Sequence, residues 1–174
     1  MTTIIASTNR PESYTLKVAQ HYQKGLAELG HPSEILSLGN LPEKIIHPAM
    51  YETQKIESWK PIQSLVTQTQ KFLFVIPEYN GSFPGILKVF IDACEFPKSF
   101  SGKKAALVGI STGKYGNIRG VDHFTGICHY INLDVLSLKL HIPHIHKELN
   151  ENEVFFKEDT LKFTKQQMER FVAF

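Results

Sequence analysis

The chain has 174 residues, of which 42% are hydrophobic and 21% charged, and these ordinary globular values predict one domain over residues 1–174. A formal net charge of +2 without a dense Lys/Arg patch argues against a nucleic-acid partner. The first residues lack the features of a signal peptide, and no apolar run approaches the roughly 20 residues that span a membrane, so we expect a cytoplasmic protein.

Strand-like and helix-like segments alternate along the first half of the chain. Thr2–Ala6 predicts a short buried strand, and Ser13–Leu29 predicts a helix because leucine and alanine recur on one face and a glycine follows as a stop signal. Glu34–Leu38 predicts a second strand. Residues 39–52 contain two prolines and no clear period, so we expect an irregular excursion before a helix at 53–69.

The pattern continues in the second half. Lys71–Ile76, which contains the apolar run Phe72–Ile76, predicts a third strand, and apolar residues at helical spacing predict a helix over Pro84–Cys94. Lys104–Ile110 predicts a fourth strand, which is followed by a helix at 118–131. The two cysteines of the chain, Cys94 and Cys128, lie far apart within helical patterns and are expected to be buried free thiols of a reducing compartment.

The last two elements complete an alternating α/β pattern. Val135–Ile142 alternates apolar and polar residues, which indicates a half-exposed edge strand, and a last helix is expected at about 160–172. Strands one, three and four are continuously apolar and belong in the centre, whereas strand two is short and flanked by polar residues. We therefore predict a three-layer α/β/α sandwich of flavodoxin-like type, with a five-stranded parallel sheet in the order 2-1-3-4-5.

Three loops follow the central strands, at the sheet edge where open α/β folds bind ligands. The first, residues 7–15, offers hydroxyl groups on Thr8, Ser13 and Thr15, the guanidinium group of Arg10 and the free N–H groups of a helix start. Such donors suit a phosphate group, because the helix dipole also favours a negative charge there. The alternative is that Ser13 merely caps the helix.

The second loop, Pro77–Gly85, combines a rigid turn with close access to the backbone. Asn80-Gly81 is a turn signal, and Pro84 suits the first turn of a helix. Gly81 and Gly85 have no Cβ, so a planar ligand can approach the main chain closely. An ordinary strand-to-helix turn is the alternative interpretation.

The third loop, residues 111–120, contains three glycines together with Tyr115 and Asn117, which suits a wall for an aromatic ring. Gly109–Lys114 is one residue short of a Walker phosphate loop, and tyrosine stands where serine or threonine would bind magnesium. The glycine-rich dinucleotide fingerprint is also missing after the first strand. These two negatives argue against an NTPase and a Rossmann dehydrogenase.

Together these loops resemble those of the NADPH-dependent FMN reductases, a flavodoxin-like family that includes quinone, azo-dye and chromate reductases. Pro77–Lys88 with Ile91-Asp92 resembles the family signature P-E-Y-N-x-S-x-P-G-x-L-K…I-D, and Ser111–Arg119 resembles its glycine-rich third loop. The S/T-x-R-x-x-S element that holds the FMN phosphate in the family is matched by Thr8, Arg10 and Ser13.

The resemblance implies FMN as cofactor, NADPH or NADH as co-substrate, and a homodimer or homotetramer. The residues that it and the loop chemistry place at the FMN are Thr8, Arg10, Ser13, Tyr14 and Thr15 in the first loop, Pro77, Glu78, Tyr79, Asn80 and Gly81 in the second, and Ser111, Thr112, Gly113, Tyr115 and Gly116 in the third. Pro77–Gly81 would contact the isoalloxazine and the ribityl chain, and Ser111–Gly116 the other edge of the ring.

The implied activity is an oxidoreductase in which hydride passes from nicotinamide to FMN and electrons pass on to a small acceptor: a quinone, an azo compound, chromate or flavin. Because the flavin carries this chemistry, no catalytic side chain is expected. One alternative is an FMN electron carrier reduced by a partner protein, although such carriers tend to be acidic and this chain is slightly basic. A flavin-free binding protein with the same fold is a third hypothesis.

Two departures from the family pattern concern the site. Ser7 stands where the family usually has glycine and could narrow the phosphate site, and Tyr115 could stack on the ring or obstruct the nicotinamide. His141, His144 and His146 suggest a metal at first sight, but no cysteine or carboxylate lies beside them at a zinc-ligand spacing. We therefore expect histidines of a strand edge and no metal.

Overall fold

A parallel sheet forms the centre of the computed structural model, which describes all 174 residues. The sheet has the order β2-β1-β3-β4-β5, with β6 also paired to β4, so the predicted order 2-1-3-4-5 is confirmed. The strands are β1 (Thr2–Ala6), β2 (Ser33–Ser37), β3 (Lys71–Pro77), β4 (Lys104–Ile110), β5 (Asp134–Val135) and β6 (Leu140–Ile142).

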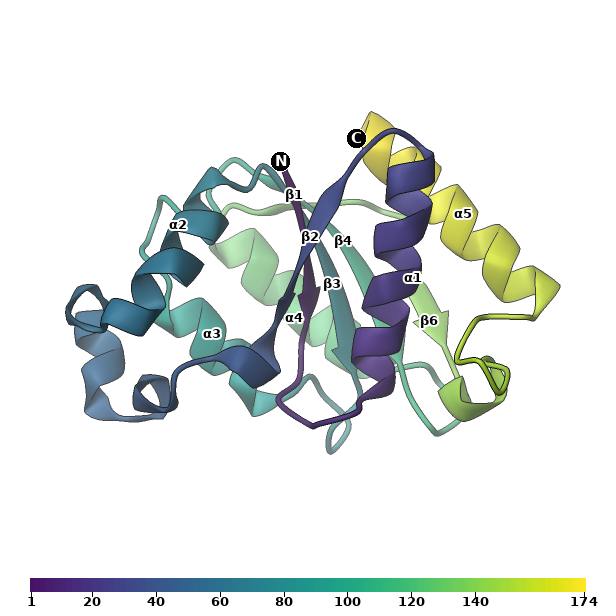
Figure 1. Ribbon diagram of the computed structural model, residues 1–174, viewed down its shortest axis with the longest axis horizontal. Coiled ribbons are helices and arrows are strands. Elements are labelled where there is room, and N and C mark those ends of the chain that lie inside the picture. Colours follow the sequence, from purple (N-terminus) through teal and green to yellow (C-terminus); the bar gives the residue numbers. More distant parts are fainter.

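Helices cover both faces of this sheet, which confirms the three-layer sandwich (Figure 1). The helices are α1 (Tyr14–Glu28), α2 (Lys60–Gln68), α3 (Gly85–Ala93), α4 (Ile118–Tyr130) and α5 (Glu158–Ala173). Because side chains alternate along a strand, Phe72 and Phe74 of β3 enter the core beneath α2, α3 and α4. Leu73 and Val75 enter the second core beneath α1 and α5. Both faces of β3 are therefore buried, as its apolar run predicts.

The predicted fifth strand, Val135–Ile142, is divided in the structure. The N–H of Leu136 donates to the carbonyl of Ala105 at 2.8 Å, which continues the pairing of β5 with β4. The next carbonyl of β4 along this edge, that of Leu107, instead accepts a hydrogen bond from the side-chain amide of Gln167 at 3.0 Å.

Gln167 lies on α5 and is fully buried, and the same amide also donates to the carbonyl of Leu138 at 2.9 Å. A side chain thus replaces the missing ladder bond, and pairing resumes only at β6. The prediction of one continuous strand over 135–142 was wrong because it treated the edge as an uninterrupted ladder.

The predicted helix at 53–69 begins only at Lys60. Residues before it form four short 3₁₀ segments, at Leu38–Asn40, Glu43–Ile46, Pro48–Lys55 and Glu57–Trp59. Ile56 has extended backbone angles (φ −97°, ψ 101°) that interrupt the helical turns. Pro61 lies in the first turn of α2, where its missing N–H costs nothing. The proline therefore marks the true start of the helix.

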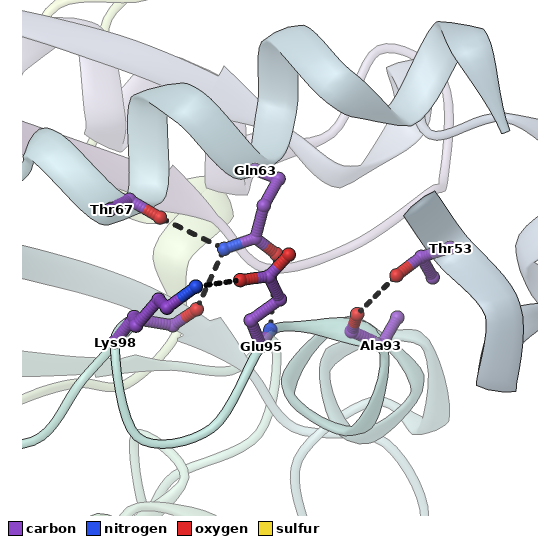
Figure 2. A network of polar contacts seen from close by, with 7 residues as sticks. Thr53, Gln63, Thr67, Ala93, Glu95 and Lys98 are labelled. Atoms are coloured by element: carbon purple, nitrogen blue, oxygen red, sulfur yellow. Dashed lines mark hydrogen bonds and ion pairs between the residues drawn. The ribbon is translucent and has the colours of Figure 1, made fainter. Parts of the chain in front are cut away.

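Side-chain hydrogen bonds hold this irregular segment and α2 against the end of α3 (Figure 2). The Gln63 amide nitrogen donates to the Ser99 hydroxyl at 3.0 Å, and its oxygen accepts from the backbone N–H of Glu95 at 3.1 Å. The Thr53 hydroxyl donates to the carbonyl of Ala93 at 3.3 Å. Trp59 is 1% exposed and packs edge-on against a core phenylalanine, so it belongs to the core.

Both cysteines are free and buried, as predicted. Burial raises the pKa of the Cys94 thiol and raises that of Cys128 to about 12, so both thiols are protonated at neutral pH. None of the helices is both long and apolar enough to cross a bilayer.

The packing of α1 against α5 contains a partly buried histidine. His21 on α1 lies in hydrogen-bonding contact with the Thr164 hydroxyl on α5, at 3.0 Å from Nε2, and its ring meets Phe155 edge-on at 4.8 Å. Burial lowers the pKa of His21 below its usual 6.5, while the charge of Glu28 acts in the opposite direction and that of Lys24 in the same direction. A neutral imidazole therefore fits this contact better than a charged one.

We expect the free energy of unfolding to fall as the pH drops below 6.5, in part because of His21. The unfolded chain binds a proton there before the folded chain does, so stability is lost between pH 6.5 and the lower folded-state pKa. Urea denaturation at pH 7.5 and 5.5 tests this in the wild type and in His21→Gln, which removes the titrating group. The variant should lose less stability between the two pH values, and equal losses would contradict the assignment.

Candidate functional site

The loops after β1, β3 and β4 lie side by side at the carboxyl edge of the sheet, the lower edge in Figure 1. Neighbouring parallel strands end at the same edge, and β3 pairs with both β1 and β4. The sheet order therefore brings together all three of the loops that the sequence singles out. A hollow of about 720 Å³ between α1 and α5 lies apart from them.

The second loop contains a tight two-residue turn. Tyr79 and Ser82 exchange backbone hydrogen bonds of 2.9 and 3.0 Å, and Asn80 and Gly81 between them have φ values of 52° and 74°. Positive φ at both central positions is the geometry that Asn-Gly favours. The N–H of Glu78 donates to the carbonyl of Ile110 at 2.9 Å, so the turn is also attached to the end of β4.

The third loop is folded around the hydroxyl group of Ser111. This hydroxyl donates to the carbonyl of Gly113 at 2.9 Å and accepts from the N–H of Gly116 at 3.0 Å. Gly116 has a φ of 58°, and a Cβ on it would lie 2.6 Å from the backbone between His141 and Ile142. The buried side chain of Ser111 thus shapes the loop, whereas Thr112, Gly113 and Tyr115 are exposed on its outer side.

Asn117 fixes the third loop to the end of β3, just before the second loop, a role that sequence reasoning missed. Its side chain is fully buried, donates to the carbonyl of Ile76 at 3.0 Å and accepts from the N–H of Gly120 at 3.1 Å. A Cβ on Gly120 would come within 2.7 Å of the backbone of Ser82. The start of α4 therefore touches the second loop directly. The sequence signal that could have indicated this role was the position of Asn117 directly before a helix, where asparagine is a favoured N-cap.

The first loop ends in the N-terminus of α1. Ser13 caps this helix, and its hydroxyl accepts from the N–H of Leu16 at 3.3 Å. The N–H groups of Tyr14 and Thr15 lie in the first turn, where no carbonyl of the helix can reach them. Thr15 itself is buried, with 1% of its surface exposed. Capping and free donors are thus both present at this turn, beside the exposed Arg10.

A hydrogen bond joins the first loop to the second. The Thr8 Oγ1 and Tyr79 Oη atoms are 2.7 Å apart, and the N–H of Arg10 donates to the same threonine oxygen at 3.2 Å. Ser7 is fully buried, and its hydroxyl donates back to the carbonyl of Ile5 at 3.3 Å. The side chain of Ser7 is therefore held against the main chain of its own strand.

A hollow of about 450 Å³ opens between the second and third loops, lined by Glu78, Tyr115, Ile118 and Arg119. The guanidinium of Arg119 lies next to the turn, since its Nη1 would be 3.8 Å from a Cβ on Gly81. Tyr115 and Ile118 expose 57% and 44% of their surface at the rim. Arg119 and Ile118 are the lining residues that the predicted contact set omitted.

The three histidines that suggest a metal, His141, His144 and His146, do not share a set of contacts. His141 Nδ1 contacts the carbonyl of Gly116 at 3.3 Å, and His144 Nδ1 contacts that of Thr112 at 3.2 Å. The rings of His144 and His146 are 6.2 Å apart. No group of three or more His, Cys, Asp or Glu side chains is arranged to hold a metal ion.

Solved structures share this architecture. FerB, an NAD(P)H:acceptor oxidoreductase from Paracoccus denitrificans, superposes with a TM-score of 0.81 at 24% identity, covering 99% of this chain and 94% of FerB. The apo form of the NADH:FMN oxidoreductase EMOB gives a TM-score of 0.79 at 16% identity, covering 99% and 88% of the two chains. These likenesses confirm the flavodoxin-like fold.

Sequence comparisons identify the family. A 2-hydroxy-1,4-benzoquinone reductase from a Burkholderia species is 25% identical over 174 residues, covering 98% of this chain and 93% of the relative. A quinone reductase from Pseudomonas putida is 34% identical over 126 residues, covering 69% and 64% of the two chains. Residues 2–147 match the model of the NADPH-dependent FMN reductases. The chain therefore belongs to the NADPH-dependent FMN reductase family and is an oxidoreductase that uses FMN and NAD(P)H.

Proposed function

We propose that this chain reduces a quinone with electrons from NAD(P)H, in a site formed by the loops after β1, β3 and β4. The observation that carries the proposal is the convergence of these loops, joined by the bond between Thr8 and Tyr79 and by the buried side chain of Asn117. The choice of a quinone over azo compounds, chromate or free flavin rests on the relatives named as quinone reductases.

The first loop fits the phosphate group of FMN. The hydroxyl of Thr15 and the free N–H groups at the start of α1 lie where a phosphate would receive several hydrogen bonds. Arg10 is exposed, so its guanidinium is available to the same group. On this proposal Thr8, Arg10, Ser13, Tyr14 and Thr15 hold the phosphate, and the capping role of Ser13 coexists with it.

The second and third loops fit the ring system. Pro77–Gly81 supplies a backbone wall with a glycine at its tip, and Ser111–Gly116 supplies the opposite wall. FMN supplies the redox chemistry when bound, by accepting a hydride and passing two electrons on. The protein's own contribution is to position the reactants in the hollow, so no side chain is given a catalytic role. Glu78 acts through its backbone, which orders the turn.

The spectrum of the purified protein after FMN loading and desalting tests this proposal. We expect near-stoichiometric flavin absorbance that anaerobic NADPH or NADH bleaches, and that 1,4-benzoquinone then restores. The more effective nucleotide gives the donor preference. Retained flavin that neither nucleotide bleaches would point to an electron carrier, and a protein that retains no flavin would overturn the proposed site.

A single domain that forms a homodimer or homotetramer in the cytoplasm is also part of the proposal. Phe96 and Tyr130 expose 70% and 87% of their surface beside an apolar hollow at the ends of α3 and α4, and a second copy would cover them. The two free thiols agree with a reducing compartment. Light scattering during size-exclusion chromatography measures the oligomeric state, and a monomer at micromolar concentration would contradict it.

A further inference from the structure

The Thr8 hydroxyl is the point where the phosphate loop and the ring loop meet. Thr8 is 2% exposed, so water has little access to it. Its Oγ1 accepts from the N–H of Arg10 at 3.2 Å and lies 2.7 Å from the Tyr79 hydroxyl. Two backbone hydrogen bonds to Ser82 hold the main chain of Tyr79, so the position from which its side chain extends is fixed. The pair therefore has a defined geometry before any ligand binds.

Counting hydrogens fixes the direction of this pair when a phosphate is bound. A threonine hydroxyl has one hydrogen to donate and two lone pairs that accept. A phosphate dianion offers only acceptors, so Thr8 binds it by donating its single hydrogen. That hydrogen is then no longer available to Tyr79. The short contact between Thr8 and Tyr79 survives only if the tyrosine hydroxyl is the donor.

We propose that Tyr79 is a positioning residue for the cofactor phosphate, acting through Thr8. Its hydroxyl donates to Thr8 Oγ1 and thereby turns the hydrogen of Thr8 towards the phosphate. The turn that contacts the flavin ring would thus also recognise the far end of the same molecule. This inference rests on the proposed FMN site and adds that Tyr79 favours FMN over riboflavin, which has the same ring but no phosphate.

Flavin fluorescence titrations give the dissociation constants of FMN and riboflavin for the wild type, Tyr79→Phe, Thr8→Val and the double variant. Loss of one neutral hydrogen bond predicts that Tyr79→Phe weakens FMN binding about five-fold and leaves riboflavin binding unchanged. Loss of a bond to a charged group predicts that Thr8→Val weakens FMN binding by roughly ten-fold or more. In the Thr8→Val background, Tyr79→Phe should add nothing further.

Two results would overturn the inference in the presence of a working site. Equal weakening of FMN and riboflavin by Tyr79→Phe would mean that the hydroxyl serves the ring alone. Full additivity in the double variant would mean that Tyr79 acts on the phosphate without Thr8. A wild type that binds neither flavin would instead refute the proposed function. Tyr51→Phe removes the same atom from a side chain that is 79% exposed and should change neither constant.

Discussion

Replacement of Gly109 by alanine is expected to lower the free energy of unfolding by about 2 kcal/mol and to weaken FMN binding at least about ten-fold. Gly109 lies within β4, and a Cβ there would be 2.3 Å from the backbone oxygen of Gly116 and 2.8 Å from Val121. The backbone of the third loop cannot give way as a flexible side chain could, so the loop must move. Urea denaturation of the apoprotein and FMN fluorescence titration measure the two effects.

The sign of this effect is informative, because alanine is ordinarily better than glycine in a strand by about 0.5–1 kcal/mol. Gly126→Ala is a matched control: Gly126 lies on α4 with nothing within 4 Å of an added Cβ. That variant should be as stable as the wild type or more so, with unchanged FMN affinity. A Gly109→Ala protein that behaves like the control would show that the close approach of β4 and the third loop is unimportant.

Replacement of Gln167 by leucine should cost about 3–5 kcal/mol of the free energy of unfolding, because it leaves buried polar groups unpaired. The side-chain nitrogen of Gln167 donates to the carbonyls of Leu107 and Leu138. The side-chain oxygen of Gln167 accepts from the Tyr22 hydroxyl at 2.6 Å. Leucine fills a similar volume, so the loss reports hydrogen bonding more than packing. Urea denaturation at pH 7.5 gives the value.

A second substitution separates the three bonds of Gln167. Tyr22 is fully buried, so in the Gln167→Leu protein its hydroxyl cannot replace the lost hydrogen bond with one to water. Adding Tyr22→Phe removes that unpaired group and should restore about 1 kcal/mol or more. The two carbonyls remain unpaired, so recovery should be partial. A loss below about 1 kcal/mol in Gln167→Leu alone would mean that the divided strand edge does not depend on this side chain.

The order of the sheet was predictable because burial leaves a pattern in each strand. Residues 72–76 are continuously apolar and lie in the centre, whereas the alternation in 135–142 indicates an edge. The three site loops were predictable for a related reason, since parallel strands end together. The Asn80-Gly81 turn followed from local chemistry alone, because only a few residue pairs accept two consecutive positive φ values.

Contacts between distant parts of the chain were not predictable. Gln167 and Leu107 are 60 residues apart, and nothing around either one indicates that a side-chain amide will interrupt the strand edge. Thr8 and Tyr79 are separated by 71 residues, so each was assigned to its own loop without the bond that joins them. The start of α2 was missed for a local reason, since the prediction of a helix at 53–69 did not use Pro61 as the signal of a helix start.

Asn117 connects the third loop to the end of β3. The site therefore has two parts, a frame that such bonds hold and a rim of exposed side chains. The frame depends on a buried amide and on backbone groups, whereas Tyr115 and Ile118 at the rim are exposed and take no part in those bonds. Substitutions at the rim therefore leave the frame intact. A lineage can exchange these two side chains stepwise and change the molecules it accepts without first losing the fold of its site.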